Sequence, residues 1–256
     1  MALDADGDPY ITLGADEEDS EDEEFEIKPT DLLILAARNE DDVSNLEVWV
    51  YEEADDGGEA NVYVHHDILL PAFPLCISWM DCGPCGSSDQ ANMAAVGTME
   101  VGIEIWDLDV VDSVEPVVCL GGEEKAGASK QEVPDKKKKK VSLTGDKAVV
   151  VGISEIYHLN VLATLQKKGK NSRMAYKEGS HEDSVLGLSW CQQYRNVLAS
   201  ASADKTVKVW DISQQTCEHT LRHHTSKVQS VAWNPAEAPV LLTGGYDKAA
   251  CLVGKG

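Results

Sequence analysis

The chain has 256 residues, of which 22 are Lys or Arg and 45 are Asp or Glu, giving a formal net charge of −23. A hydrophobic fraction of 43% is enough for a core, and no run approaches the roughly 20 apolar residues of a membrane-spanning helix, so a membrane protein is not expected. The acidic balance also argues against a general nucleic-acid clamp, because binding phosphates requires a basic face.

The first residues and the cysteines both favour an intracellular protein. Residues 1–19 lack the basic start and the apolar run of a secretory signal. The seven cysteines are odd in number and scattered, which predicts reduced thiols and not a disulfide framework.

The N-terminal segment is strongly acidic. Residues 1–30 contain twelve acidic residues and one lysine. Such a block repels itself and buries little surface, so we expect residues 1–28 to form a disordered acidic arm. The arm either keeps the protein soluble or recruits basic partners such as histones or ribosomal proteins. Ser20 directly precedes Glu21-Asp22-Glu23, a context typical of acidophilic kinases, and is a candidate phosphorylation site.

Residues 29–122 predict two units of short β-strands, because β-branched and aromatic runs alternate with turn residues. The first unit has three runs, at Leu32–Arg38, Leu46–Glu52 and Val62–Ile68. The second unit has four, at Leu75–Trp79, Met93–Gly97, Ile103–Leu108 and Val117–Leu120.

Between two predicted strands lies Cys82-Gly83-Pro84-Cys85, the residue order of the thioredoxin redox centre. In that centre the first cysteine opens a helix after a strand and has a lowered pKa. Here no βαβ pattern surrounds the motif, which favours a surface loop and leaves a thiol redox protein as a minor alternative. We expect no zinc site at Cys76, Cys82 and Cys85, because a second CxxC or an HxxxH partner is lacking.

Residues 123–176 are expected to form a basic insert or linker. Its five consecutive lysines, Lys136, Lys137, Lys138, Lys139 and Lys140, are typical of a nuclear-localisation signal, although lysine runs are also common in solvated linkers. A second basic patch, at residues 166–173, could complete a bipartite signal or contact RNA phosphates. Residues 141–165 are apolar, and their pattern does not decide between strand and helix.

The strongest signal is an internal repeat in residues 177–256. The segments that begin at His181 and at His224 align with an offset of 43 residues, which matches the roughly 40–45 residues of one four-stranded propeller blade. The first of these segments predicts strands at Val185–Trp190, Val197–Ser202, Thr206–Asp211 and Glu218–Arg222. The chain therefore carries about four blade units, the last one cut short.

These residues resemble the WD-repeat propeller family, whose third strand ends in Trp-Asp, with an Asp six residues and a His 29 residues before that Trp. The resemblance implies an all-β fold and a hydrogen-bonded network in which a turn Asp binds the His, a Ser hydroxyl links them and the Trp joins and shields the network. The positions that it assigns here are His181, Ser200, Ser202, Asp204, Trp210, Asp211, His224, Asp247, Trp106 and Asp107.

Two repeats depart from the family pattern. The copy that ends at Trp106 has Glu100 in place of the turn Asp and no His at the equivalent distance. The last copy has Val253 where the Trp is expected. We expect those blades to depend more on apolar packing than on the polar network.

Several segments together resemble a nucleolar branch of the WD-repeat family that has an acidic N-terminal region. They are Phe25–Asp31, Ala37–Glu53, Val64–Cys76, Ile103–Asp112 and Tyr176–Trp190. This resemblance implies a non-enzymatic scaffold for ribosome biogenesis and ribosomal RNA transcription, associated with chromatin in the nucleus and nucleolus. Its partners would be ribosome-assembly proteins and histones, with indirect contact to RNA. The alternative is a WD-repeat histone reader or ubiquitin-ligase substrate receptor.

No catalytic residue, cofactor site or metal site is assigned from the sequence, because Walker loops, dinucleotide fingerprints and nucleophile elbows are absent. We expect protein partners and no small-molecule substrate. A seven-bladed ring would need about 300 residues beyond the arm, so the four units predict an incomplete ring. Its exposed faces and edges would make the isolated polypeptide marginally stable or dependent on a partner.

Overall fold

A computed structural model describes Ile27 and residues 32–53, 59–83, 90–123, 176–237 and 239–254. Within these residues the regular elements are fourteen β-strands. Among them, no helix is long and apolar enough to cross a membrane. The acidic arm, Ser20, the five lysines and residues 141–165 lie outside the described residues.

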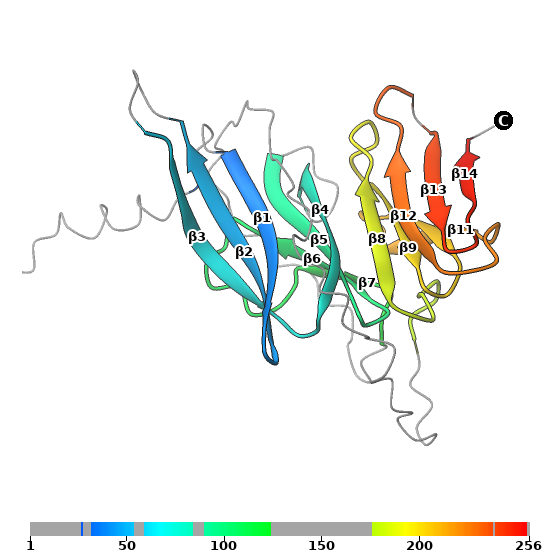
Figure 1. The fold of residues 1–256 in the computed structure, drawn as a ribbon, viewed down its shortest axis with the longest axis horizontal. Coiled ribbons are helices and arrows are strands. Elements are labelled where there is room, and N and C mark those ends of the chain that lie inside the picture. Colours follow the sequence, from blue (N-terminus) through cyan, green and yellow to red (C-terminus); the bar gives the residue numbers. More distant parts are fainter. Residues whose placement is uncertain are drawn as a thin grey trace, which may run out of the picture.

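The strands form four antiparallel sheets, each built from consecutive strands (Figure 1). Sheet 1 contains β1 (Leu32–Glu40), β2 (Val43–Glu52) and β3 (Asn61–Leu70). Sheet 2 contains β4 (Pro74–Cys82), β5 (Gln90–Thr98), β6 (Ile103–Asp107) and β7 (Val118–Leu120). Sheet 3 contains β8 (Val185–Trp190), β9 (Val197–Ser202), β10 (Val207–Asp211) and β11 (Thr216–Leu221). Sheet 4 contains β12 (Val228–Trp233), β13 (Leu241–Gly245) and β14 (Ala250–Val253).

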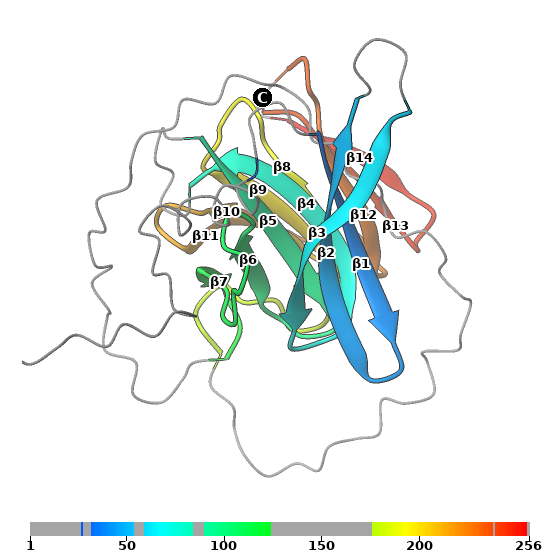
Figure 2. The same ribbon diagram turned by 90° about the vertical axis from the view of Figure 1, so that its left-hand side faces the viewer.

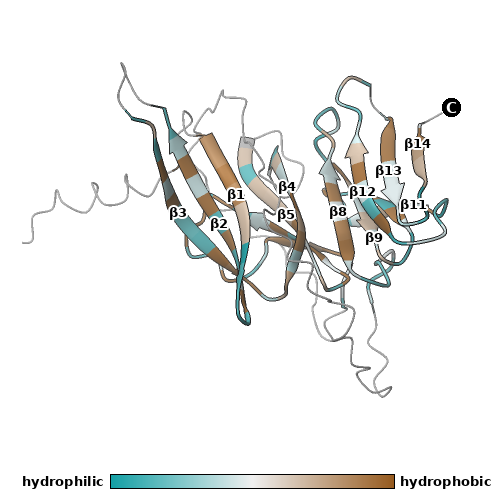
Figure 3. Cartoon of the chain, viewed as in Figure 1, coloured by the Kyte–Doolittle hydropathy of each residue, from teal (hydrophilic) through white to brown (hydrophobic). Residues whose placement is uncertain are grey.

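The sheets pack face to face in chain order, with sheets 1 and 4 at the two ends (Figures 1 and 2). The two-residue period of a strand explains how β5 serves two interfaces. Met93 and Ala95 face sheet 3, while Ala94 and Val96 face sheet 1. Apolar residues accordingly recur along the strands of every sheet in Figure 3.

Inner strands of neighbouring sheets are joined by a repeated hydrogen bond. The Ser78 hydroxyl on β4 accepts from the backbone N–H of Trp190 at 3.1 Å, and the Ser189 hydroxyl on β8 accepts from that of Trp233 at 3.1 Å. The Trp79 and Trp190 rings also meet edge to face, with centroids 6.2 Å apart. Sheets 2, 3 and 4 are therefore joined at equivalent positions along the stack.

The predicted all-β class and the four blade units are confirmed. The predicted strands of sheet 3 match β8 and β9 at both ends, whereas β11 begins two residues before the predicted Glu218. The pairing of β10 with β11 also shifts register between Val209 and Trp210.

The point where the chain leaves sheet 2 lies next to the point where it enters sheet 3. Glu123 and Tyr176 form an antiparallel bridge, and the Lys177 N–H donates to the Gly122 carbonyl at 2.9 Å. The two ends of the predicted insert are thus adjacent.

Candidate functional site: the histidine–aspartate networks

Sheet 3 contains a connected polar network. His181 precedes β8, Ser200 lies on β9, Asp204 lies in the turn between β9 and β10, and Trp210 lies on β10. His181 Nδ1 lies 2.7 Å from Asp204 Oδ2, and its Nε2 lies 2.7 Å from Ser200 Oγ. Trp210 Nε1 donates to the same Ser200 oxygen at 2.9 Å. Ser200 is therefore the hydroxyl that links the His to the Trp.

The partners assign the protonation of His181. Its Nδ1–H donates to the Asp204 carboxylate, so Nε2 carries a lone pair and accepts the Ser200 O–H. Every polar atom of the His181 ring, the Ser200 hydroxyl and the Trp210 N–H is thereby satisfied, which is the condition for a buried network to be stabilising. Burial lowers the pKa of His181, outweighing the Asp204 carboxylate, and favours this neutral form.

The Asp204 carboxylate also organises its own turn. Burial opposes its ionisation, but hydrogen bonds from His181, from Thr206 Oγ1 at 2.6 Å and from the Glu182 backbone at 3.0 Å together lower its pKa. Lys205, within this turn, has a φ of 73°. The carboxylate is thus ionised and ties the β10 end of the β9–β10 connection to the segment before β8.

Ser202 and Asp211 have separate roles. The Ser202 hydroxyl accepts from the Asp204 N–H at 3.1 Å and donates to the Asp183 carbonyl at 3.0 Å, so it supports the turn without touching His181. Asp211 accepts from Asn196 Nδ2 at 3.1 Å and from the Ser213 N–H at 2.8 Å after β10.

Sheet 4 repeats the network with a different fourth member. His224 Nδ1 lies 2.9 Å from Asp247 Oδ2, and its Nε2 lies 2.9 Å from Thr243 Oγ1. The hydrogen bond from the Thr225 backbone N–H lowers the pKa of Asp247 most, and the hydrogen bond from His224 lowers it further. Burial opposes ionisation, but the resulting pKa is about 2. No Trp stands at Val253, and His223 Nε2 lies 2.8 Å from Thr243 Oγ1 instead. His223 thus takes the position that the indole N–H of Trp210 has in sheet 3.

Sheet 2 lacks this arrangement, as the departures in its sequence predict. Trp106 is buried, but its Nε1 donates to Glu104 Oε2 at 3.2 Å, and burial raises the pKa of Glu104. Asp107 accepts from the Asp109 N–H at 3.2 Å, and Glu100 donates its N–H to the Thr98 hydroxyl. Trp106 is held mainly by the apolar cluster between sheets 1 and 2.

Three network members were not predicted from the sequence. Thr243 stands 43 residues after Ser200, so the repeat offset could have found it. Thr206 follows the turn Asp by two residues and has no counterpart in sheet 4, where Ala249 stands. His223 has no signal in the repeat pattern, because its equivalent in sheet 3 is Ser180.

The thioredoxin-like motif lies in an unsuitable environment. Cys82 ends β4 with only 1% of its surface exposed, and its thiol donates to the Arg195 carbonyl at 3.0 Å. Burial raises the pKa of Cys82, whereas a redox-active thiol needs a lowered one. Pro84 and Cys85 lie outside the described residues.

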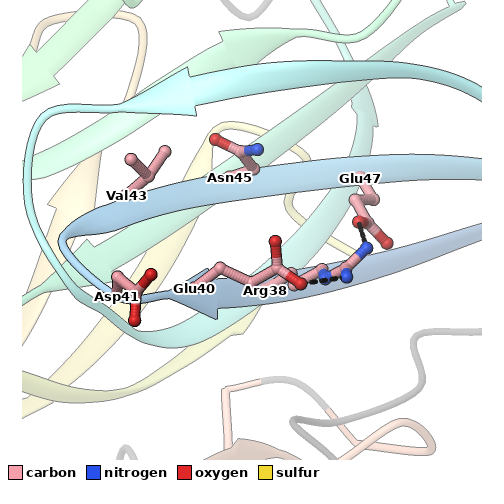
Figure 4. Close-up of a pocket in the computed structure, with 6 residues that line it drawn as sticks. All are labelled: Arg38, Glu40, Asp41, Val43, Asn45 and Glu47. Carbon is pink, nitrogen blue, oxygen red and sulfur yellow. Dashed lines mark hydrogen bonds and ion pairs between the residues drawn. The ribbon is translucent and has the colours of Figure 1, made fainter.

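A shallow polar pocket lies on the β1–β2 hairpin (Figure 4). Its lining residues are Arg38, Glu40, Asp41, Val43, Asn45 and Glu47. Arg38 is paired with Glu40 and, at 3.2 Å, with Glu47. The lining holds no nucleophile with an adjacent base, so it offers no catalytic arrangement.

The pH dependence of stability should reveal the neutral His181. The pKa of an unfolded histidine is about 6.5, and burial holds the pKa of folded His181 below that value. The stabilisation that neutral His181 contributes is therefore present above about pH 6.5 and falls as the pH decreases. When the pH falls from about 7.5 to about 5, the parent protein should lose about 1 kcal/mol more unfolding free energy than His181→Asn loses.

Urea denaturation of both proteins across this pH range measures the difference. His66 and His223, whose pKa values are also lowered mainly by burial, are present in both proteins and cancel in the comparison. Identical pH slopes for the parent and His181→Asn would contradict a neutral His181.

Comparisons with known proteins agree with this geometry. The family described as "WD domain, G-beta repeat" matches residues 175–211 and 215–252. Together with the four stacked sheets, the match and the two networks define a WD-repeat β-propeller protein.

The wider similarity extends beyond the two repeats. Periodic tryptophan protein 1 of Saccharomyces cerevisiae is 37% identical over 96% of this chain and 42% of that protein. The periodic tryptophan protein 1 homolog of Drosophila melanogaster is 34% identical over 91% of this chain and 39% of that protein. This chain is thus similar to periodic tryptophan protein 1 over most of its length, and it spans less than half the length of these relatives. The ribosome biogenesis protein WDR12 homolog of Chlamydomonas reinhardtii is 34% identical over 35% of this chain and 21% of that protein.

Proposed function

We propose that this chain is part of a non-enzymatic WD-repeat scaffold that assembles proteins during ribosome biogenesis in the nucleolus. The observation that carries the proposal is the 37% identity to periodic tryptophan protein 1 across 96% of the chain. The similarity to a relative named as a ribosome biogenesis protein supports the same process. Participation in ribosomal RNA transcription and association with chromatin belong to this proposal.

The physical basis is a rigid frame that presents variable loops. The two networks fix the β9–β10 and β13–β14 turns, and the inter-sheet hydrogen bonds hold successive blades together. Loops on such a frame carry recognition, because the strands are committed to packing. Within the described residues, the polar groups of the networks bind one another and leave no reactive group poised for catalysis.

Charge indicates the kind of partner. The net charge of −23, concentrated in part in residues 1–28, favours basic proteins such as ribosomal proteins, assembly factors or histones. In this scheme residues 1–28 are an acidic arm, residues 123–176 a basic insert, and residues 29–122 and 177–256 the blades. Any association with RNA would be indirect, through these basic partners. Phosphorylation of Ser20 would add further negative charge to the arm.

Affinity purification from nuclear extract tests the proposal. The tagged chain should enrich ribosome-assembly proteins, and deletion of residues 1–28 should reduce the most basic of them in a salt-dependent way. Enrichment of histones without assembly factors, or of cullin-type ligases, would replace this function by a histone reader or a ubiquitin-ligase substrate receptor.

The lysine run should direct nuclear import. Replacing Lys136–Lys140 with glutamine in a fluorescent fusion should shift the protein from the nucleus to the cytoplasm, because import receptors recognise clustered positive charge. The matched control replaces the lysines and arginine of residues 166–173 in the same way. Unchanged nuclear accumulation after the first replacement would remove the assignment to the lysine run, and loss only after the second would transfer it to the other patch.

A further inference from the structure

Three side chains of sheet 4 bring metal-binding atoms together. His223 and His224 precede β12, and Cys251 lies on β14. One donor atom from each side chain lies within 4.8 Å of those of the other two. We propose that His223, His224 and Cys251 bind one Zn²⁺ ion. This inference is independent of the scaffold function.

The donor set suits zinc. Imidazole nitrogen and thiolate sulfur are its commonest protein ligands, and three protein ligands with a fourth open position are a known zinc coordination. Carboxylate-preferring ions such as Mg²⁺ and Ca²⁺ would find no oxygen-rich set in this cluster.

His224 is already oriented for metal binding. Its Nδ1–H donates to Asp247 at 2.9 Å, which leaves the lone pair of Nε2 directed toward Thr243. A carboxylate that holds the far nitrogen of a histidine fixes the tautomer and the ring orientation that a metal ligand needs. Asp247 would therefore act as a positioning residue.

The strand register gathers the three donors around one hydroxyl. Thr243 pairs with Cys251 across β13 and β14, so both side chains lie on the same face of the sheet. The Nε2 atoms of His223 and His224 lie 2.8 and 2.9 Å from Thr243 Oγ1. Tetrahedral zinc needs donors about 3.3–3.8 Å apart, so these side chains must close by about 1 Å. The Thr243 hydroxyl would then lose its hydrogen bonds to the two imidazoles and lie beside the ion.

One side of the site faces solvent, and its proton balance is simple. His223 is exposed and Cys251 is half-buried, so an ion can reach these two ligands from the surface, whereas His224 is buried. Binding replaces one proton on the Cys251 sulfur, which is released to solvent, and affinity should rise with pH accordingly. The ion would connect the segment before β12 to the edge strand β14 and so clamp all of sheet 4.

Cobalt titration of the full chain, purified without a histidine tag, tests the site. One equivalent of Co²⁺ should produce tetrahedral d–d bands and a thiolate-to-cobalt charge-transfer band, and Zn²⁺ should displace both. Cys251→Ser should abolish the charge-transfer band, and His223→Ala should weaken binding by about tenfold or more. Cys217→Ser and Cys85→Ser are matched controls that should leave the spectrum unchanged.

A second measurement keeps the proposal testable if a variant folds poorly. In the unaltered chain, Zn²⁺ should slow alkylation of Cys251, followed by mass spectrometry, and should leave the alkylation rate of Cys217 unchanged. Each of four results would overturn the site and leave only a hydrogen-bonded network. The first three are absence of the charge-transfer band, its persistence in Cys251→Ser and its loss in Cys85→Ser. The fourth is an equal alkylation rate of Cys251 with and without Zn²⁺.

Discussion

Replacing Trp210 with alanine should lower the free energy of unfolding by about 3–5 kcal/mol. The indole is 1% exposed and packs in the cluster shared by sheets 2 and 3. Its ring also lies against Gly121, where a Cβ atom would come within 3.2 Å of it. Truncation would therefore open a cavity at an interface between sheets and remove the donor to Ser200.

Urea denaturation, followed by tryptophan fluorescence and far-UV circular dichroism, measures this effect. Trp210→Phe should cost less, about 1–3 kcal/mol, because it retains much of the volume and loses the N–H. Tyr194→Ala is the matched control, since Tyr194 is 53% exposed and its loss should change stability by no more than about 0.5 kcal/mol. A similar cost for Trp210→Ala and Tyr194→Ala would show that the indole does not anchor the interface.

His181→Ala should destabilise the protein by about 3–5 kcal/mol, because it leaves a buried carboxylate without its principal partner. The side chains of His181 and Asp204 are 0% and 6% exposed. Adding Asp204→Ala to His181→Ala should cost less than the two single changes together, with a coupling of about 1–3 kcal/mol, because the second change removes the stranded charge.

The double-mutant cycle is measured by urea denaturation at neutral pH. His219→Ala provides the control, because this histidine is exposed on β11. Strictly additive losses would mean that His181 and Asp204 stabilise sheet 3 separately, and the network would then be a set of independent hydrogen bonds.

Much of this architecture follows from local pattern and repeat spacing. The period-2 runs predict the strands of sheets 1 to 3, and the 43-residue offset places His224 and Asp247 opposite His181 and Asp204. These features are readable because each blade repeats the same strands and turns in the same order.

Other features depend on contacts between distant segments. Ser200 and Ser202 lie on the same face of β9, so the choice of Ser200 depends on which hydroxyl the Trp210 indole reaches along the strand. The raised pKa of Cys82 depends on burial against the β8–β9 loop, where its thiol meets the Arg195 carbonyl. In sheet 4 His223 takes the place of the indole donor, and this depends on the tilt between the rings of His223 and His224, whose centroids are 4.5 Å apart. No sequence period encodes such distances.

The bridge between Glu123 and Tyr176 has a consequence for how this protein can vary. When the two ends of a connection are held side by side, lengthening the connection adds only a slowly growing entropic cost. Related proteins can therefore differ widely in this stretch while keeping the same blades. Engineers can likewise use the junction to graft a reporter or to splice in a short turn.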